Sequence, residues 1–225
     1  MLPLSIRAYF DPDLERILAH VQQHLDPDAA HDVGHCLRVA EWTVRLAENA
    51  VPARLCIAAA LLHDIVNIPK NHADRGLASQ YSATKARELL ADLSFDAADI
   101  DLVADAIRDH SFTRGAVPES TLGKALQDAD RLEALGVIGT FRCIATGVRF
   151  GADFFDAFDP WATNRPLDDK RFSIDHFFVK LLRLPATFHT DAGRREAERR
   201  AAVMRKLLEA LGEEIGQPAV AGTSV

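Results

Sequence analysis

The feature that most constrains the fold is the apolar stretch at residues 55–62, Leu-Cys-Ile-Ala-Ala-Ala-Leu-Leu, which follows Pro52 and runs directly into His63 and Asp64. Its composition predicts a helix over residues 53–65. A helix that is apolar on nearly all sides is buried, so we expect this one at the centre of the core. Its end then places an imidazole and a carboxylate, both able to bind a metal, at the boundary between core and solvent.

The rest of the chain predicts more helices, and no segment shows the strict alternation of a strand. Asp11 followed by Pro12 is a typical helix start. We expect helices over residues 11–25, 31–49, 77–93, 97–110, 119–135 with a continuation to 149, from about 173, and 190–211. The predicted fold class is therefore all-α. We expect one domain over residues 1–225, a helical bundle with a core of about 10–213 and a short frayed C-terminal tail.

Residues 151–171 break this pattern, because phenylalanines, prolines and aspartates follow one another there without a helical period. We expect an ordered aromatic loop or lid near the mouth of a site. In that position Phe154, Phe155 or Trp161 would cover a base. The alternative is that these rings only close a hydrophobic end of the bundle.

Composition excludes several classes of protein. The net charge of −7 argues against a general binder of nucleic-acid polymers, which needs a basic face. Three widely spaced cysteines, Cys36, Cys56 and Cys143, indicate buried thiols in a reducing compartment. No window reaches transmembrane length, so we expect a cytoplasmic protein without membrane contact.

Two further residues complete a metal-ligand set with His63 and Asp64. His35 lies upstream and Asp130 downstream, which gives two nitrogen and two oxygen donors, a set suited to one divalent first-row metal. The alternative is a group of separate polar side chains: His35 a core histidine, Asp64 a helix cap, and Asp130 paired with Arg131.

Together these residues resemble the H…HD…D signature of the HD-domain metal-dependent phosphohydrolases. The resemblance is closest to the small YedJ-like bacterial branch and covers roughly residues 10–210. Its most specific part is the ten-residue segment around Asp130. The matching segments are Ala30-His31-Asp32-Val33-Gly34-His35, His63-Asp64-Ile65-Val66, His110-Ser111-Phe112, Gln127-Asp128-Ala129-Asp130-Arg131-Leu132-Glu133-Ala134-Leu135-Gly136, and Asp175-His176-Phe177 with Lys180-Leu181-Leu182.

The resemblance implies a hydrolase of the HD-domain type that acts on a phosphate ester or anhydride, with a nucleotide as the substrate class. Mixed imidazole and carboxylate ligands favour Mn, Fe, Co, Ni or Zn over Mg alone. Some nucleotide-hydrolysing relatives have a glutamate three residues after the His-Asp pair as general acid, whereas this chain has Asn67. The acid is therefore another group or metal-bound water.

Individual roles follow from chemistry and position. Asp64 is predicted to bind the metal and to accept a proton from water. His110 is predicted to be a phosphate donor or leaving-group acid, the alternative being a helix-end contact. The phosphate-binding candidates are Lys70, Arg131 and Lys180, which are otherwise surface charges.

His35 and His63 need partners that orient their rings, and we expect Asp32 or Asp128 to supply such a contact. Asp128 and Asp130 point about 200° apart on a helix, so only one of them can face the ion.

Two other functions remain open: an HD-fold di-iron oxygenase, for which only His72 and His110 are available as extra ligands, and a non-catalytic metal or nucleotide sensor. The expected partner is a small phosphorylated molecule, with a homodimer left open.

Overall fold

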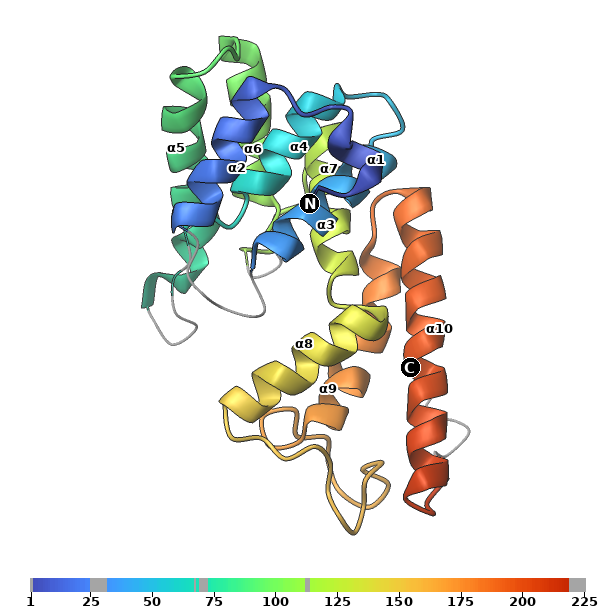
Figure 1. Ribbon diagram of the computed structural model, residues 1–225. Coiled ribbons are helices and arrows are strands. Elements are labelled where there is room, and N and C mark those ends of the chain that lie inside the picture. Colours follow the sequence, from blue (N-terminus) through green and yellow to red (C-terminus); the bar gives the residue numbers. More distant parts are fainter. Residues whose placement is uncertain (1, 25–31, 67, 69–72, 112–113, 219–225) are drawn as a thin grey trace. The chain divides into compact units, whose positions relative to one another are not determined.

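A computed structural model describes residues 2–24, 32–66, 68, 73–111 and 114–218 (Figure 1). Regular structure in these ranges is helical, and an isolated bridge between Asp153 and Phe172 is the only β-type pairing there. This confirms the all-α prediction. The chain divides into two compact units, Met1–Asp130 and Arg131–Val225. The predicted frayed tail lies largely outside the described residues.

The first unit is arranged around its most apolar helix. Its elements are α1 (Leu4–Arg7), α2 (Pro12–His24), α3 (Val33–Leu46), α4 (Ala53–Leu62), the 3₁₀ turn η1 (Ala73–Leu77), α5 (Ala78–Ala91), α6 (Ala97–Asp109) and α7 (Thr121–Leu132), which extends into the second unit. Helix α4 contacts α2, α3, α5 and α6 (Figure 1). Every side chain from Leu55 to Leu62 is buried. The predicted central helix is therefore confirmed, because only surrounding helices can bury an apolar surface on all sides.

Aspartate caps fix where several helices begin. The Asp11 carboxylate accepts a hydrogen bond from the Leu14 N–H (2.9 Å), and Asp32 accepts one from the His35 N–H (2.7 Å). Such bonds satisfy N–H groups that have no partner inside the helix. Helix α3 ends earlier than predicted, because Glu48 and Asn49 have positive φ angles of 46° and 64° and cannot continue it.

The second unit contains α8 (Gly136–Arg149), α9 (Ser173–Val179), the 3₁₀ segment η3 (Leu181–Thr187) and α10 (Asp191–Glu214). Helix α10 packs against α8 and η3. The expected continuation of the preceding helix to residue 149 is interrupted. Leu135 is extended, and Gly136 has a φ of +70°, a conformation that glycine adopts without strain.

Residues 151–171 form the non-helical loop that the sequence predicts, and buried polar contacts hold it. Asp175 is fully buried and accepts hydrogen bonds from Arg165 at Nη1 (2.5 Å) and Nη2 (2.9 Å) and from the Asp168 N–H (2.7 Å). A buried carboxylate with charged and backbone donors is well compensated. These contacts explain how a loop without a helical period is ordered.

The aromatic rings of this loop fall into two groups. Trp161 is 6 % exposed, and its Nε1–H donates to the Gln217 carbonyl (2.8 Å). A buried indole has no free face for a base, so the predicted base-covering role does not suit Trp161. Phe154 is 54 % exposed and retains an open ring face.

Two further expectations concern cysteines and membranes. Cys36 and Cys56 are buried as predicted, whereas Cys143 is partly exposed, and all three thiols are free. Among the described residues, no helix combines the length and apolarity needed to cross a bilayer.

Candidate metal centre

Four side chains that lie far apart in the sequence converge in the first unit. His35 lies in the first turn of α3, which the Asp32 cap fixes, and His63 and Asp64 follow the last residue of α4. Asp130 lies near the end of α7. We call these four residues the histidine–aspartate cluster: His35, His63, Asp64 and Asp130.

The donor atoms of the cluster lie within a few ångströms of one another. His35 Nε2 is 3.2 Å from His63 Nε2 and 3.5 Å from Asp130 Oδ1. His63 Nε2 is 3.6 Å from Asp64 Oδ2 and 3.9 Å from Asp130 Oδ1. These side chains therefore face a common point.

This arrangement fits a divalent metal. Imidazole nitrogens and carboxylate oxygens bind first-row ions at about 2.0–2.2 Å, so neighbouring donors lie roughly 3 Å apart and opposite ones roughly 4 Å apart. All four measured distances fall in that range. His35, His63 and Asp64 also form a group whose ligand atoms lie within 4.8 Å of one another. The fit rests on donor chemistry as well as on spacing.

Burial prepares His63 to act as a neutral ligand. Its Nδ1 lies 2.7 Å from the Ala60 carbonyl oxygen, an acceptor only, so Nδ1 carries the hydrogen and Nε2 presents its lone pair to the cluster. Burial lowers the pKa of His63 to about 4, which keeps the ring neutral at physiological pH. The two partly exposed carboxylates, Asp64 and Asp130, supply the negative charge.

The group that orients the His63 ring is the Ala60 carbonyl, whereas Asp32 or Asp128 was expected. A backbone carbonyl of α4 orients this ring, in place of an aspartate; metal-binding histidines commonly have such a partner. Asp32 acts on His35 through the backbone N–H as a helix cap. Nothing in the sequence beyond the i, i−3 spacing to Ala60 indicates the carbonyl contact.

His110 borders the cluster, at the end of α6. Its ring meets the ring of His63 edge-on, with centroids 4.9 Å apart, and its Nε2 lies 3.6 Å from Asp64 Oδ1. Burial opposes protonation of His110, but the carboxylates of Asp64 and Asp130 and the Ile107 carbonyl raise its pKa above the ordinary histidine value. This site residue predicted from the sequence therefore lies next to the ligand set.

Asp128 and Asp130 lie two residues apart on α7, and their side chains differ in contacts and burial. Asp130 contributes Oδ1 to the cluster and has a side chain 27 % exposed, whereas Asp128 is fully buried. The sequence did not single out Gln127, which is also fully buried and donates from Nε2 to the carbonyls of Asp109 (2.8 Å) and Ala116 (3.0 Å). Its position one turn before Asp130 is the signal that points to it.

The three predicted phosphate-binding residues lie in the second unit or outside the described residues. Arg131 belongs to the second unit, where its Nη1 donates to the Thr187 carbonyl (2.5 Å). Lys180 follows α9 in that unit and is partly buried. Lys70 lies outside the described residues, as do His31, Asn67 and His72.

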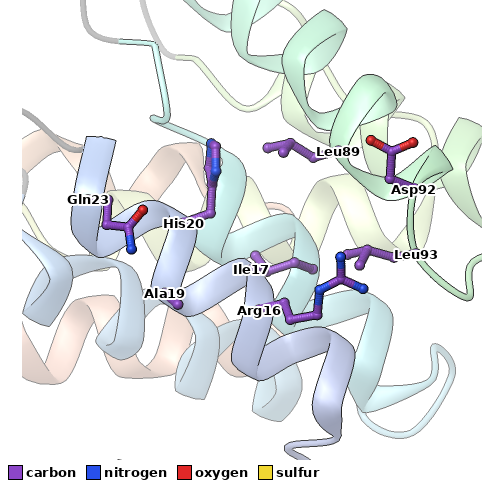
Figure 2. Close-up of a pocket in the computed structure, with 8 residues that line it drawn as sticks. All are labelled: Arg16, Ile17, Ala19, His20, Gln23, Leu89, Asp92 and Leu93. Carbon is purple, nitrogen blue, oxygen red and sulfur yellow. The ribbon is translucent and has the colours of Figure 1, made fainter.

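A hollow of about 340 Å³ opens elsewhere on the first unit, between α2 and α5 (Figure 2). Ile17, Leu89 and Leu93 give it an apolar lining, and Arg16, His20 and Asp92 are among its polar residues (Figure 2). None of the site residues predicted from the sequence lines it. The hollow is therefore a separate feature of the first unit from the histidine–aspartate cluster.

Comparison with known proteins agrees with that geometry. The family described as HD domain matches residues 32–135, a stretch that holds all four residues of the cluster. The uncharacterized protein YpgQ of Bacillus subtilis (strain 168) is 30 % identical over 207 residues, which are 89 % of this chain and 93 % of YpgQ. The chain belongs to the HD-domain family.

Solved structures of HD-domain proteins extend the similarity to nearly the whole chain. A crystal structure of B. subtilis YpgQ in complex with ADP has a TM-score of 0.68 and 27 % identity, covering 95 % of this chain and 97 % of that one. An HD-superfamily hydrolase from Bacillus thuringiensis has a TM-score of 0.69 and 29 % identity, covering 90 % and 96 %.

Proposed function

We propose that this protein is a metal-dependent phosphohydrolase that acts on a nucleotide. The observation that carries the proposal is the convergence of two imidazole nitrogens and two carboxylate oxygens, which are linked by four distances of 3.2–3.9 Å, each involving a histidine Nε2. His35, His63, Asp64 and Asp130 would hold one divalent ion, with Mn, Fe, Co, Ni or Zn favoured by the mixed donors. Such an ion lowers the pKa of a bound water and polarises a phosphoryl oxygen.

The protein's own groups supply the proton transfers. The two oxygens of the Asp64 carboxylate face different rings. Oδ2 lies 3.6 Å from His63 Nε2, within the cluster, and Oδ1 lies 3.6 Å from His110 Nε2. In this proposal Asp64 accepts the proton of the attacking water. His110, which its acidic neighbours favour in the protonated form, donates a proton to the leaving oxygen.

A nucleotide is the substrate class that the comparisons favour. The related YpgQ was crystallised with ADP, and the alignment covers nearly all of both chains. The exposed ring of Phe154 is a candidate to cover the base, in place of Trp161. Lys70, Arg131 and Lys180 remain proposed phosphate ligands.

The test is a screen of the purified protein against nucleoside mono-, di- and triphosphates with Mn²⁺, Co²⁺, Ni²⁺, Zn²⁺, Fe²⁺ and Mg²⁺, with products separated by ion-exchange chromatography. Chelation should abolish hydrolysis, and one of the first-row ions should restore it. Full turnover by metal-stripped protein would overturn the proposal.

The same preparations distinguish the two other functions. An oxygenase would purify with two irons per chain and consume oxygen. A sensor would bind metal and nucleotide without any turnover. Elemental analysis and the product screen together separate the three.

A further inference from the structure

Gln127 connects the end of the helix that precedes His110 to the helix that carries Asp130. Its side chain is fully buried on α7, and its Nε2 atom donates to the backbone carbonyls of Asp109 (2.8 Å) and Ala116 (3.0 Å). A glutamine amide has two N–H donors, so both are used. Gln127 and Asp130 are three residues apart, which makes them neighbours on the surface of α7. One side chain therefore ties the end of α6 to the part of α7 that faces the cluster.

The end of α6 has backbone carbonyls for which the helix supplies no donor, and side chains satisfy two of them. The last four carbonyls of any helix lack partners within it. His110 Nδ1 lies 2.6 Å from the Ile107 carbonyl oxygen, and Gln127 donates to the carbonyl of Asp109. Asp109 is the last residue of α6, so its carbonyl belongs to the planar peptide group that joins it to His110. The Gln127 amide therefore holds the peptide group from which His110 continues.

Two contacts then fix the direction of the His110 ring. Gln127 holds the peptide group before it, and the Ile107 carbonyl, an acceptor only, holds its Nδ1–H. The other nitrogen, Nε2, lies 3.6 Å from Asp64 Oδ1. The His110 residue is 4 % exposed and Gln127 is fully buried, so water has little access to replace a lost amide donor.

We propose that Gln127 is a positioning residue for His110, holding the peptide group before it so that the ring faces Asp64. Gln127 acts through the backbone at Asp109 and leaves metal binding unchanged. The inference rests on the proposed function, in which His110 donates a proton to the leaving oxygen. Proton transfer depends on the separation of the reacting atoms, so a displacement of about 1 Å is enough to slow the reaction about 100-fold.

The first measurement needs no turnover. In the ¹⁵N-labelled full chain with Zn²⁺, a diamagnetic ion, the Nδ1–H of His110 should give an NMR resonance protected from exchange, because it is buried and hydrogen-bonded. His110→Asn identifies the resonance by removing it. Gln127→Met keeps the length of the side chain and removes both donors. We expect the resonance to shift and to exchange with water about 10-fold faster, as loss of one hydrogen bond predicts.

Leu122→Val is the matched control, because Leu122 is a fully buried residue of the same helix and its truncation weakens packing without touching the amide. It should lower Tm and leave the His110 resonance in place. Gln127→Asn keeps both donors on a side chain one methylene shorter, so its effect should lie between wild type and Gln127→Met. Circular dichroism verifies folding, and Gln127→Asn supplies the comparison if Gln127→Met does not fold.

A double-mutant cycle with His110→Asn then tests whether Gln127 acts through His110. In the wild-type background we expect Gln127→Met to lower kcat for the best nucleotide about 10- to 100-fold, with Mn²⁺ affinity unchanged in calorimetric titrations. In the His110→Asn background the same change should leave kcat nearly unaltered, because no ring remains to be positioned.

An unchanged His110 resonance in both Gln127 variants, or an equal shift in Leu122→Val, would overturn the inference. Equal kcat losses in the two backgrounds would also overturn it, since they would assign Gln127 a general role in stability. Loss of Mn²⁺ binding would contradict it as well, by placing the effect on the metal ligands. Failure of the proposed function looks different: the Gln127 variants would displace the His110 resonance, but the wild type would hydrolyse no nucleotide.

Discussion

His35 Nε2 and His63 Nε2 lie 3.2 Å apart in a fully buried position. Because the Nδ1–H of His63 is bonded to the Ala60 carbonyl, the His63 nitrogen in this pair presents a lone pair. The contact is favourable only when a hydrogen or a cation lies between the rings. A metal bound by both Nε2 atoms and by the carboxylates of Asp64 and Asp130 would accept the lone pairs of both rings at once.

Asp130 and Asp128 should differ in their effect on metal. Asp130→Asn removes a proposed ligand charge, so we expect Mn²⁺ affinity to fall at least ~100-fold and hydrolysis to be lost with it, since even second-shell changes can have effects of that size. Asp128→Asn should keep its metal, with any loss confined to stability because Asp128 is fully buried. Calorimetry and elemental analysis measure both. Equal metal loss in the two variants would mean that the ligand assignment is wrong.

His110→Asn should separate proton transfer from metal binding. Because the ring borders the ligand set, we expect kcat to fall about 10²- to 10⁴-fold with Mn²⁺ stoichiometry unchanged. Steady-state kinetics on the best nucleotide, with metal analysis of the same sample, test this. Loss of metal in the variant would instead assign His110 to the ligands.

Asp11 should contribute to stability in a pH-dependent way. Burial alone would raise its pKa, but the Leu14 N–H and Arg54 hold the pKa below the usual 3.8. The contribution is therefore present above that value and is lost as pH falls through the lower folded pKa. Asn also caps helices, so Asp11→Asn removes only the charge paired with Arg54 (2.7 Å).

We expect Asp11→Asn to lower the free energy of unfolding by about 0.2–1 kcal/mol at pH 7, the range of exposed ion pairs. The difference from wild type should shrink as the pH falls below 4. Urea titrations at pH 7, 5 and 3 measure it. A difference that grows toward acid would contradict the sign.

Trp161 should stabilise the second unit without contacting substrate. Trp161→Phe removes the hydrogen bond to the carbonyl of the exposed residue Gln217, so we expect the free energy of unfolding to fall by about 0.5–1.5 kcal/mol with KM unchanged. Phe154→Ala, at a half-exposed position, should change stability by at most about 0.5 kcal/mol. A raised KM in Phe154→Ala supports the base-covering role. A raised KM in Trp161→Phe at full stability would return that role to Trp161.

The sequence alone was sufficient for the helical class, the central place of residues 55–62 and the position of His63 and Asp64 at the end of that helix. These features follow from local composition and spacing, because a helix apolar on all sides is buried and His63 and Asp64 are fixed to its end. Helix boundaries were less well determined. The break at Gly136 depends on one backbone angle that the periodicity of the surrounding residues does not encode.

The tertiary structure decided which groups support the site. The Ala60 carbonyl that orients His63 and the hydrogen bonds from Gln127 to the Asp109 and Ala116 carbonyls depend on contacts that residue types do not specify. The burial of Trp161 is of the same kind, because an aromatic residue in a loop can face either solvent or core. Sequence determines which side chains have the right chemistry, whereas packing determines which of them have partners.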